Sequence, residues 1–205
     1  LGWHRMINKK LFSNFSLVYS NYRYFLGTPA GNNNSFEWNS KLRDAGLKGD
    51  FSYYMNASNT IRFGVSMIYH LFSPGHARGI GSETVLTEVK VPDQQALETG
   101  VYATNEQRIG DHLTLKYGIR FSMFQNLGAA TVYKFNDAFQ VTDSSVYSPM
   151  QFYNTYTGLE PRLGLLYDFN SRHSVKASYA RTYQYLQLAQ NSTVGTPLDI
   201  WFPSS

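Results

Sequence analysis

The sequence of 205 residues contains no cysteine, so it can form neither a disulfide framework nor a thiolate metal site. Charge is scarce as well, because only 16% of the residues are Asp, Glu, Lys or Arg and the formal net charge is +4. No run of lysine and arginine of the kind that binds nucleic acid is present. We therefore expect no nucleic-acid partner.

Long hydrophobic runs are also missing. No stretch of about 18 consecutive apolar residues occurs, so there is no candidate for a membrane-spanning helix. This excludes helices only, because the lipid-facing and lumen-facing residues of a membrane β-barrel alternate and their hydropathies cancel. The aromatic content of 16%, with 16 tyrosines, is unusual for a soluble domain.

The two ends of the sequence lack features of a complete chain. It begins at Leu1 without an initiator methionine or an apolar signal segment, and its last residues, 199–205, do not form a closing strand. We therefore expect residues 1–205 to be a piece of a longer polypeptide.

A strict alternation of residue types is the strongest pattern that is present. In LTLKYGIRFSM, residues 113–123, every odd-numbered residue is apolar and every even-numbered one is polar or glycine. The pattern recurs at 61–71 and 159–169, where Ile68 and Leu166 are the apolar exceptions on the polar rows. Such rows predict strands with one apolar and one polar face. Strands of soluble proteins have about five or six residues, whereas crossing a bilayer needs about nine to eleven. These strands are long enough to cross.

Short and long connections alternate between the strands. Short turn signals fall at residues 8–10, 56–60, 109–112 and 170–173, and the segments 27–35, 73–82 and 125–155 are longer. The predicted strands are residues 1–7, 11–25, 36–55, 61–72, 83–107, 113–124, 156–169 and 174–186. Tight turns at one end and long loops at the other are typical of outer-membrane barrels. We therefore predict an all-β fold, a transmembrane antiparallel β-barrel.

Finer details of the strands can be predicted too. The apolar row changes parity between Leu42 and Phe51, which predicts a β-bulge at 44–46. A hairpin symmetric about Gly110 places Glu106 opposite Thr114, and a pair Phe169–Val175 places Asp168 opposite Lys176. Aromatic residues toward the long loops are predicted to form an upper membrane-interface belt or to lie above it: Tyr22, Tyr24, Trp38, Phe72, Tyr183 and Tyr185.

Two groups of residues are candidates for function. The first consists of charged residues on the polar rows, which line a lumen or contact a plug, or form a structural charge lattice: Arg62, Glu98, Glu106, Lys116, Arg120, Glu160, Arg162, Asp168 and Lys176. The second consists of aromatic residues in the loops, which either stack on a ligand or pack together: Tyr147, Phe152, Tyr153, Tyr156 and Trp201.

Catalytic and metal sites are not expected. No two of the five histidines have ligand spacing along a helix, and only His70 and His76 lie near one loop base, where Glu83 is the nearest carboxylate in sequence. No nucleophile elbow is recognisable. We predict no metal, cofactor or enzymatic activity.

Several motifs resemble the barrel of TonB-dependent outer-membrane receptors. They are Asn105-Glu106 before a turn, the tetrapeptide YGIR at 117–120 after it, and Glu160-Pro161-Arg162 on the strand that leads to Tyr167. The similarity extends from about Leu11 to Trp201 and includes residues 94–128 and 156–191. It implies a barrel of about 22 strands, of which this chain supplies about eight, without the plug domain or the final strands. It also implies an outer-membrane receptor that imports a scarce ligand, with the plug and TonB as partners.

Other interpretations remain open from the sequence. A passive or structural barrel, such as a porin or an adhesin, has the same strands, and a soluble sandwich or a barrel hydrolase is a more distant alternative. The ligand of a receptor can be a siderophore, glycan, peptide, cobalamin or haem, and the loop aromatics favour a glycan or peptide. Membrane lipid is an expected partner, and a surface lipoprotein or other subunits are further candidates.

Overall fold

The computed structural model describes residues 1–27, 35–81, 84, 87–189 and 200–204. All regular elements in these ranges are strands. Within the same residues, no helix is long and apolar enough to cross a membrane. The strands are β1 (Gly2–Met6), β2 (Leu11–Gly27), β3 (Phe36–Asn56), β4 (Asn59–Gly79), β5 (Val89–Lys90), β6 (Gln94–Ile109), β7 (Leu113–Leu127), β8 (Ala130–Phe135), β9 (Val141–Tyr147), β10 (Phe152–Asn170), β11 (His173–Ala180), β12 (Leu186–Ala189) and β13 (Ile200–Pro203).

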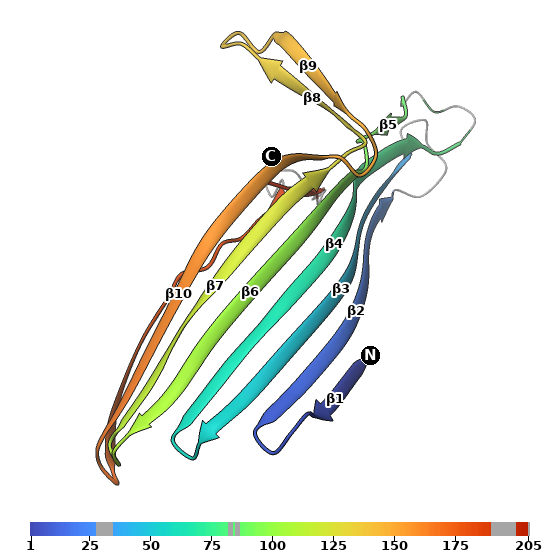
Figure 1. Ribbon diagram of the computed structural model, residues 1–205. Coiled ribbons are helices and arrows are strands. Elements are labelled where there is room, and N and C mark those ends of the chain that lie inside the picture. The colour runs from blue at the N-terminus through green and yellow to red at the C-terminus, as the bar shows by residue number, and fades with distance from the viewer. Residues whose placement is uncertain (28–34, 82–83, 85–86, 190–199, 205) are drawn as a thin grey trace.

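The long strands form one antiparallel meander (Figure 1). Their order across the sheet is β1-β2-β3-β4-β6-β7-β10-β11, so each strand lies next to its predecessor in this series. The short connections lie at one end of the sheet, and the β8–β9 hairpin stands away from the other end. The all-β fold predicted from the sequence is confirmed, as are eight successive strands in one sheet, to which the short β5 adds a ninth beside β4. The sheet is open, with β1 and β11 at its two edges.

Asparagine side chains shape three of the four short turns. Asn8 Oδ1 accepts the backbone N–H groups of Lys10 and Leu11, each at 2.9 Å. Asn56 Oδ1 accepts Ser58 N–H at 2.9 Å, and Asn170 Oδ1 accepts the N–H groups of Arg172 and His173. Such Asx turns satisfy backbone donors that the ladder leaves unpaired. The turn signals of the sequence therefore mark the observed hairpins.

The two faces of the sheet differ sharply in polarity. Between Ile61 and Leu71, the odd-numbered row of β4 is apolar and is exposed at Phe63, Val65 and Met67, whereas the even-numbered row carries polar or small side chains apart from Ile68. The total accessible surface is 13861 Å², against about 9,700 Å² for a compact monomer of this mass. No described segment covers the apolar face, so the apolar rows do not meet in a dry interior. This contradicts the soluble-sandwich alternative.

The predicted hairpin registers are wrong by two residues. Glu106 lies opposite Lys116, and Asp168 lies opposite Ser174. The β6–β7 connection is Gly110, Asp111 and His112, centred on Asp111, and Gly110 adopts φ of 62°. A shift of two residues leaves every side chain on its predicted face, because side chains alternate with period two.

The predicted bulge at 44–46 does not exist. The β2–β3 pairing runs without a shift from Leu11 to Gly27, and the β3–β4 pairing shifts between Asn39 and Lys41 and between Tyr54 and Asn56. Trp38 and Leu42 therefore stay on the inner face, by which we mean the face of the even-numbered polar rows. Both are buried there, as are Phe72 and Tyr185, so the predicted upper belt is wrong for Trp38, Phe72 and Tyr185.

The loop end contains strands that the sequence patterns did not predict. The segment 125–155, predicted as a loop, contains the β8–β9 hairpin, which is a separate two-stranded sheet. The strand predicted at 83–107 is divided into the short β5, which pairs with β4, and β6. The strand predicted at 174–186 ends at Ala180, after which the chain leaves the sheet.

Candidate functional site

The inner face gathers the predicted charged residues. All nine occupy even-numbered positions of β4, β6, β7, β10 and β11, and the strand registers place these positions on one face. Alternation along each strand explains why residues so distant in sequence share a face. The charges therefore form a continuous polar surface across five strands.

A first ion-paired group lies toward the short turns. Glu106 Oε2 lies 3.4 Å from Arg62 Nη1 and 3.7 Å from Lys116 Nζ. The three residues come from adjacent strands, with Glu106 on the central strand β6. Their side chains are about half exposed, so the pairs stabilise the fold only weakly.

A second group runs across the middle of the face and is less exposed. Glu160 is 4% exposed and lies 3.9 Å from Arg120 and 3.6 Å from Arg162. Arg120 also lies 3.6 Å from Glu98, whose other oxygen lies 3.9 Å from His70. One chain of neighbouring ionisable side chains therefore connects β10 to β4.

Sequence reasoning missed several members of this surface. His70 Nδ1 lies 2.8 Å from Asp44 Oδ1, and the Tyr102 hydroxyl donates to Asp50 Oδ1 at 2.6 Å. Asp50 also pairs with Lys48 at 3.1 Å. All five residues occupy even-numbered positions of strands β3, β4 and β6, so their parity was a signal that could have identified them.

Glycines on the inner face make room for the longest side chains. A Cβ on Gly100 would lie 2.6 Å from Arg120 Nη2, and a Cβ on Gly64 would lie 2.8 Å from the Tyr102 ring. Both distances are far below van der Waals contact. The glycines between the charged positions therefore allow the Arg120 and Tyr102 side chains to lie flat along the sheet.

Substitution Glu160→Gln is expected to destabilise the fold by about 1–3 kcal/mol, because it leaves two guanidinium groups beside a neutral amide. The free energy of unfolding can be measured by guanidine titration of the complete protein in lipid vesicles. Glu106→Gln is the matched control, since Glu106 is 42% exposed and should lose less than about 1 kcal/mol. An equal loss of unfolding free energy in the two variants would show that the burial of Glu160 does not strengthen its ion pairs.

Two predicted members of the charged surface stand apart from both groups. Asp168 and Lys176 lie on the inner face near the short turns, opposite Ser174 and Leu166 respectively. Neither has an ion-pair partner within the part of the chain that the structure describes.

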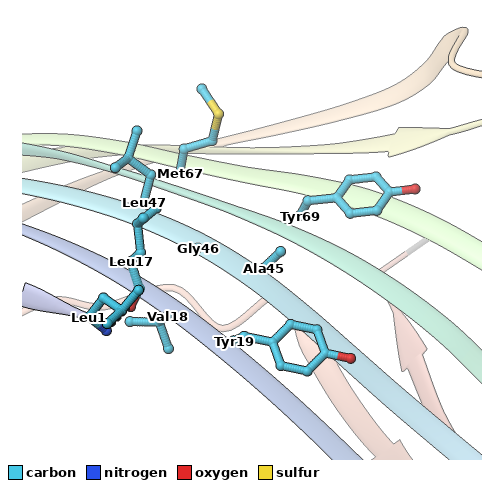
Figure 2. Close-up of a pocket in the computed structure, with 9 residues that line it drawn as sticks. All are labelled: Leu1, Leu17, Val18, Tyr19, Ala45, Gly46, Leu47, Met67 and Tyr69. Atoms are coloured by element: carbon cyan, nitrogen blue, oxygen red, sulfur yellow. Dashed lines mark hydrogen bonds between the residues drawn. The ribbon is translucent and has the colours of Figure 1, made fainter.

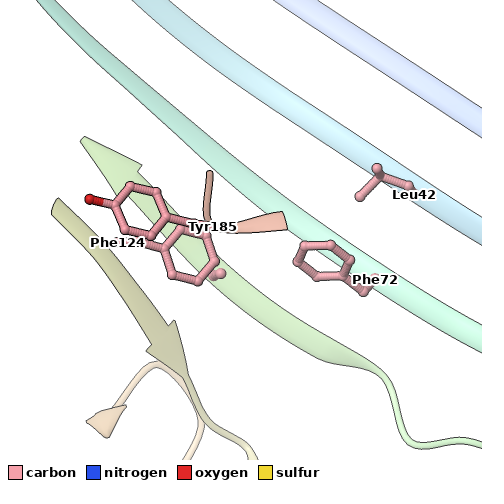
Figure 3. Close-up of a cluster of buried hydrophobic side chains, with 5 residues drawn as sticks. Leu42, Phe72, Phe124 and Tyr185 are labelled. Carbon is pink, nitrogen blue, oxygen red and sulfur yellow. The ribbon is translucent and has the colours of Figure 1, made fainter. Parts of the chain in front are cut away.

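An aromatic cluster occupies the loop side of the inner face (Figure 3). Phe124 is fully buried and stacks on Tyr185 at 5.2 Å between ring centroids, with Leu42, Phe72 and Ala96 completing the cluster. The Tyr185 hydroxyl lies 2.8 Å from Ser122 Oγ. The chain after β11 therefore folds back onto the inner face.

The five predicted loop aromatics fall into two groups rather than one. Tyr156 and Trp201 pack against the aromatic cluster. Tyr147 and Tyr153 stack on each other at 4.9 Å, and Phe152 is exposed. Of the two predicted roles, packing and ligand contact, the geometry of Tyr156 and Trp201 is that of packing.

A cavity lies beside the second group. It has a volume of about 740 Å³ and lies between the β8–β9 hairpin and the ends of β6 and β10. Its lining includes Tyr133, Tyr147 and Tyr153 together with Gln94 and Asn154. Flat rings beside amide groups can stack on a ligand and form hydrogen bonds with it.

The hairpin itself carries one ion pair. Lys134 Nζ donates to Asp143 Oδ2 at 3.0 Å across β8 and β9. This hydrogen bond lowers the pKa of the Asp143 carboxyl and raises the pKa of the Lys134 ammonium group. Both side chains are exposed, so the pair orients the hairpin more than it stabilises it.

A metal site is not formed by the described residues, in which no three His, Asp or Glu side chains could hold an ion. His76 lies 2.5 Å from Glu88 and His70 lies beside Asp44 and Glu98. Glu83, which the sequence suggested as a partner, lies outside the described residues.

Comparison with known proteins gives one family and one solved structure. Residues 1–200 match the family described as TonB dependent receptor-like, beta-barrel. Among curated proteins, none matches the sequence. The outer membrane transporter YddB from Escherichia coli aligns with 92% of this chain at 9% identity and a TM-score of 0.40. The chain spans 25% of the length of that transporter.

Proposed function

Because this chain belongs to the TonB-dependent receptor-like β-barrel family of the outer membrane, we propose that it supplies about eight strands of a barrel of about 22 that imports a scarce ligand into the periplasm. The proposal requires two partners, a plug domain inside the barrel and the energy-coupling protein TonB. In this proposal the barrel wall catalyses no reaction, and its function is to bind the ligand, to enclose it and to release it.

The observation that supports this function is the difference between the two faces of one continuous sheet. The apolar face suits lipid, whereas the inner face carries networks of paired charges and glycine gaps. Exposed charges such as Arg162 and Lys116 are available to contact a plug, since each is more than half exposed. A surface of paired charges can hold a plug and still release it, because each exposed pair contributes little alone.

The β8–β9 hairpin supplies the outer rim in this proposal. Its cavity, lined by Tyr133, Tyr147 and Tyr153, opens at the loop end, which faces the outside in barrels with short periplasmic turns. Stacked rings with amide neighbours favour a glycan or peptide over a small ion. Contact with a surface lipoprotein would also be expected at this end.

The function can be tested without knowing the ligand. Cells with and without the complete receptor, in strains with and without TonB, are grown in a complex medium whose solutes are followed by mass spectrometry. Import predicts at least one solute that is depleted only when both proteins are present. Depletion that does not require TonB would indicate a passive porin, and no depletion in any strain would indicate a structural or adhesive barrel.

Charge reversal on the inner face should impair import while the barrel still folds. In Arg120→Glu and Arg162→Glu, the new carboxylate faces Glu160, so the surface that we propose to contact the plug is disrupted. Depletion of the imported solute is expected to fall by about tenfold or more. Arg172→Glu, in the exposed turn between β10 and β11, is the matched control. Normal import by both inner-face variants would exclude this role.

A further inference from the structure

The outward face carries a cluster of cationic side chains directly beyond its apolar band. Arg23 on β2 lies opposite Lys41 on β3, and Arg43 lies two residues along β3 toward the apolar band. Lys90 on β5 lies opposite His76 on β4. These residues line a cavity of about 300 Å³ together with Asn39, Ser73 and Asp93. We define Arg23, Lys41, Arg43 and Lys90 as the basic patch.

The basic patch is not neutralised by its surroundings. Within the described part of the chain, none of its four side chains has a carboxylate within ion-pair distance, although nine other basic side chains do. His76 already pairs with Glu88, which leaves Asp93 as the carboxylate of the cavity. Like charges directly opposite each other, as Arg23 and Lys41 are, destabilise a sheet. The patch therefore favours an anion from outside these residues.

An apolar hollow adjoins the patch on the same strands (Figure 2). It has a volume of about 620 Å³ and is lined mainly by apolar side chains of β2, β3 and β4. Leu17, Leu47 and Met67 form one row across the three strands, and the rings of Tyr19 and Tyr69 lie on either side of Ala45. Both ring hydroxyls point toward the end of the sheet that carries the patch.

We propose that the basic patch and the apolar hollow together bind a phosphorylated lipid of the membrane around the barrel. Arg43 lies two residues beyond Ala45 on β3, a separation of about 7 Å. An acyl chain in the hollow therefore places its phosphate beside the guanidinium groups of Arg43 and Arg23. Arginine binds phosphate oxygens through charge-assisted, often bidentate, hydrogen bonds.

The position of the hollow favours a lipid over a free anion or an anionic protein. The hollow is continuous with the apolar rows of β2–β4, which we assign to the lipid-facing surface, so its occupant comes from the bilayer. A free phosphate ion would use the patch and leave the hollow empty. Basic residues at this depth are at the level of lipid headgroups, where each contributes about fivefold to binding. The site is independent of import and of the plug.

The test uses the complete receptor in neutral detergent and native mass spectrometry. Dioleoyl phosphatidic acid is the probe, because it combines a phosphate with two acyl chains. The variant carries Arg23→Gln, Lys41→Gln and Arg43→Gln together. We expect it to retain the probe about 100-fold less well than the wild-type receptor, since three basic residues are removed. Heat-modifiable mobility on gels confirms that the variant is folded.

Controls separate the lipid from its parts. A second variant removes three cations near the short turns, with Lys9→Gln, Arg108→Gln and Arg172→Gln, and should retain the probe as the wild type does. Dioleoylglycerol, which lacks the phosphate, should bind the wild type and the patch variant equally. Equal retention of phosphatidic acid by the patch variant would overturn the proposal. Displacement of the probe by an equal concentration of inorganic phosphate would also overturn it, because the site would then recognise the ion alone.

Discussion

Arginine in place of Met67 is expected to destabilise the folded barrel in lipid by about 2–4 kcal/mol. Met67 lies near the centre of the apolar row of β4 and is 46% exposed on the outward face. A cation at this position is placed in hydrocarbon, where it has neither water nor a counter-ion. The free energy of unfolding of the complete receptor can be measured by guanidine titration in phosphatidylcholine vesicles.

The next residue along β4 provides the matched control. Ile68 lies on the inner face opposite Glu98 on β6, so Ile68→Arg places its guanidinium group near a carboxylate and water. We expect this variant to change the free energy of unfolding by less than about 1 kcal/mol. An equally large loss of unfolding free energy in both variants would mean that the two faces of β4 contact the same solvent. A loss confined to Ile68→Arg would reverse the assignment of the faces.

Truncation of Phe124 to alanine is expected to release the chain segment that follows β11 from the inner face. The Phe124 ring is fully buried and stacks on Tyr185, with an angle of 10° between the rings. Removal of a buried phenylalanine side chain costs about 3–5 kcal/mol. If this cost lowers the free energy of local opening of the segment after β11, the population of the open segment rises by about 100-fold or more. Trypsin cleavage after Arg181 in native conditions measures this population.

Phe121→Ala is the control for this experiment, because Phe121 lies on the same strand but on the outward face, where it is 43% exposed. Its removal leaves no enclosed cavity, so cleavage after Arg181 should change by less than about threefold. If Phe124→Ala also left cleavage unchanged, the aromatic cluster would not be what holds this segment. If both variants raised cleavage equally, the effect would come from loss of β7 as a whole.

Much of the architecture was predictable because it depends on local properties of the chain. Whether Arg120 and Ile119 point to opposite faces is decided by the alternation of side chains along β7, which needs no knowledge of the neighbouring strands. The Asx turns at Asn8 and Asn170 are likewise local, since each side chain binds the backbone two or three residues away. For this reason the long strands of the main sheet, the short turns and the side of each strand on which the predicted charged residues lie could be read from the sequence.

Errors occurred where distant segments had to be placed against each other. The partner of Glu106 depends on the geometry of the turn around Asp111, and a different centre shifted it from Thr114 to Lys116. The even parity of Trp38 already indicated the inner face, and the prediction was wrong because it assumed a β-bulge at 44–46 that the uninterrupted β2–β3 pairing excludes. The β8–β9 hairpin was missed because its short strands lack a strong apolar alternation.

The sequence by itself determined that this protein is a sheet of long amphipathic strands with one face for lipid and one for charges, since a period of two is imposed by the strand backbone. Only the tertiary structure decided which charges meet, that Glu160 joins Arg120 and Arg162, and that Tyr185 returns to cover Phe124. The same is true of the basic patch, in which Arg23, Lys41 and Lys90 come from three strands. These contacts depend on register and on chain reversal over long separations, which are set by packing rather than by local preference.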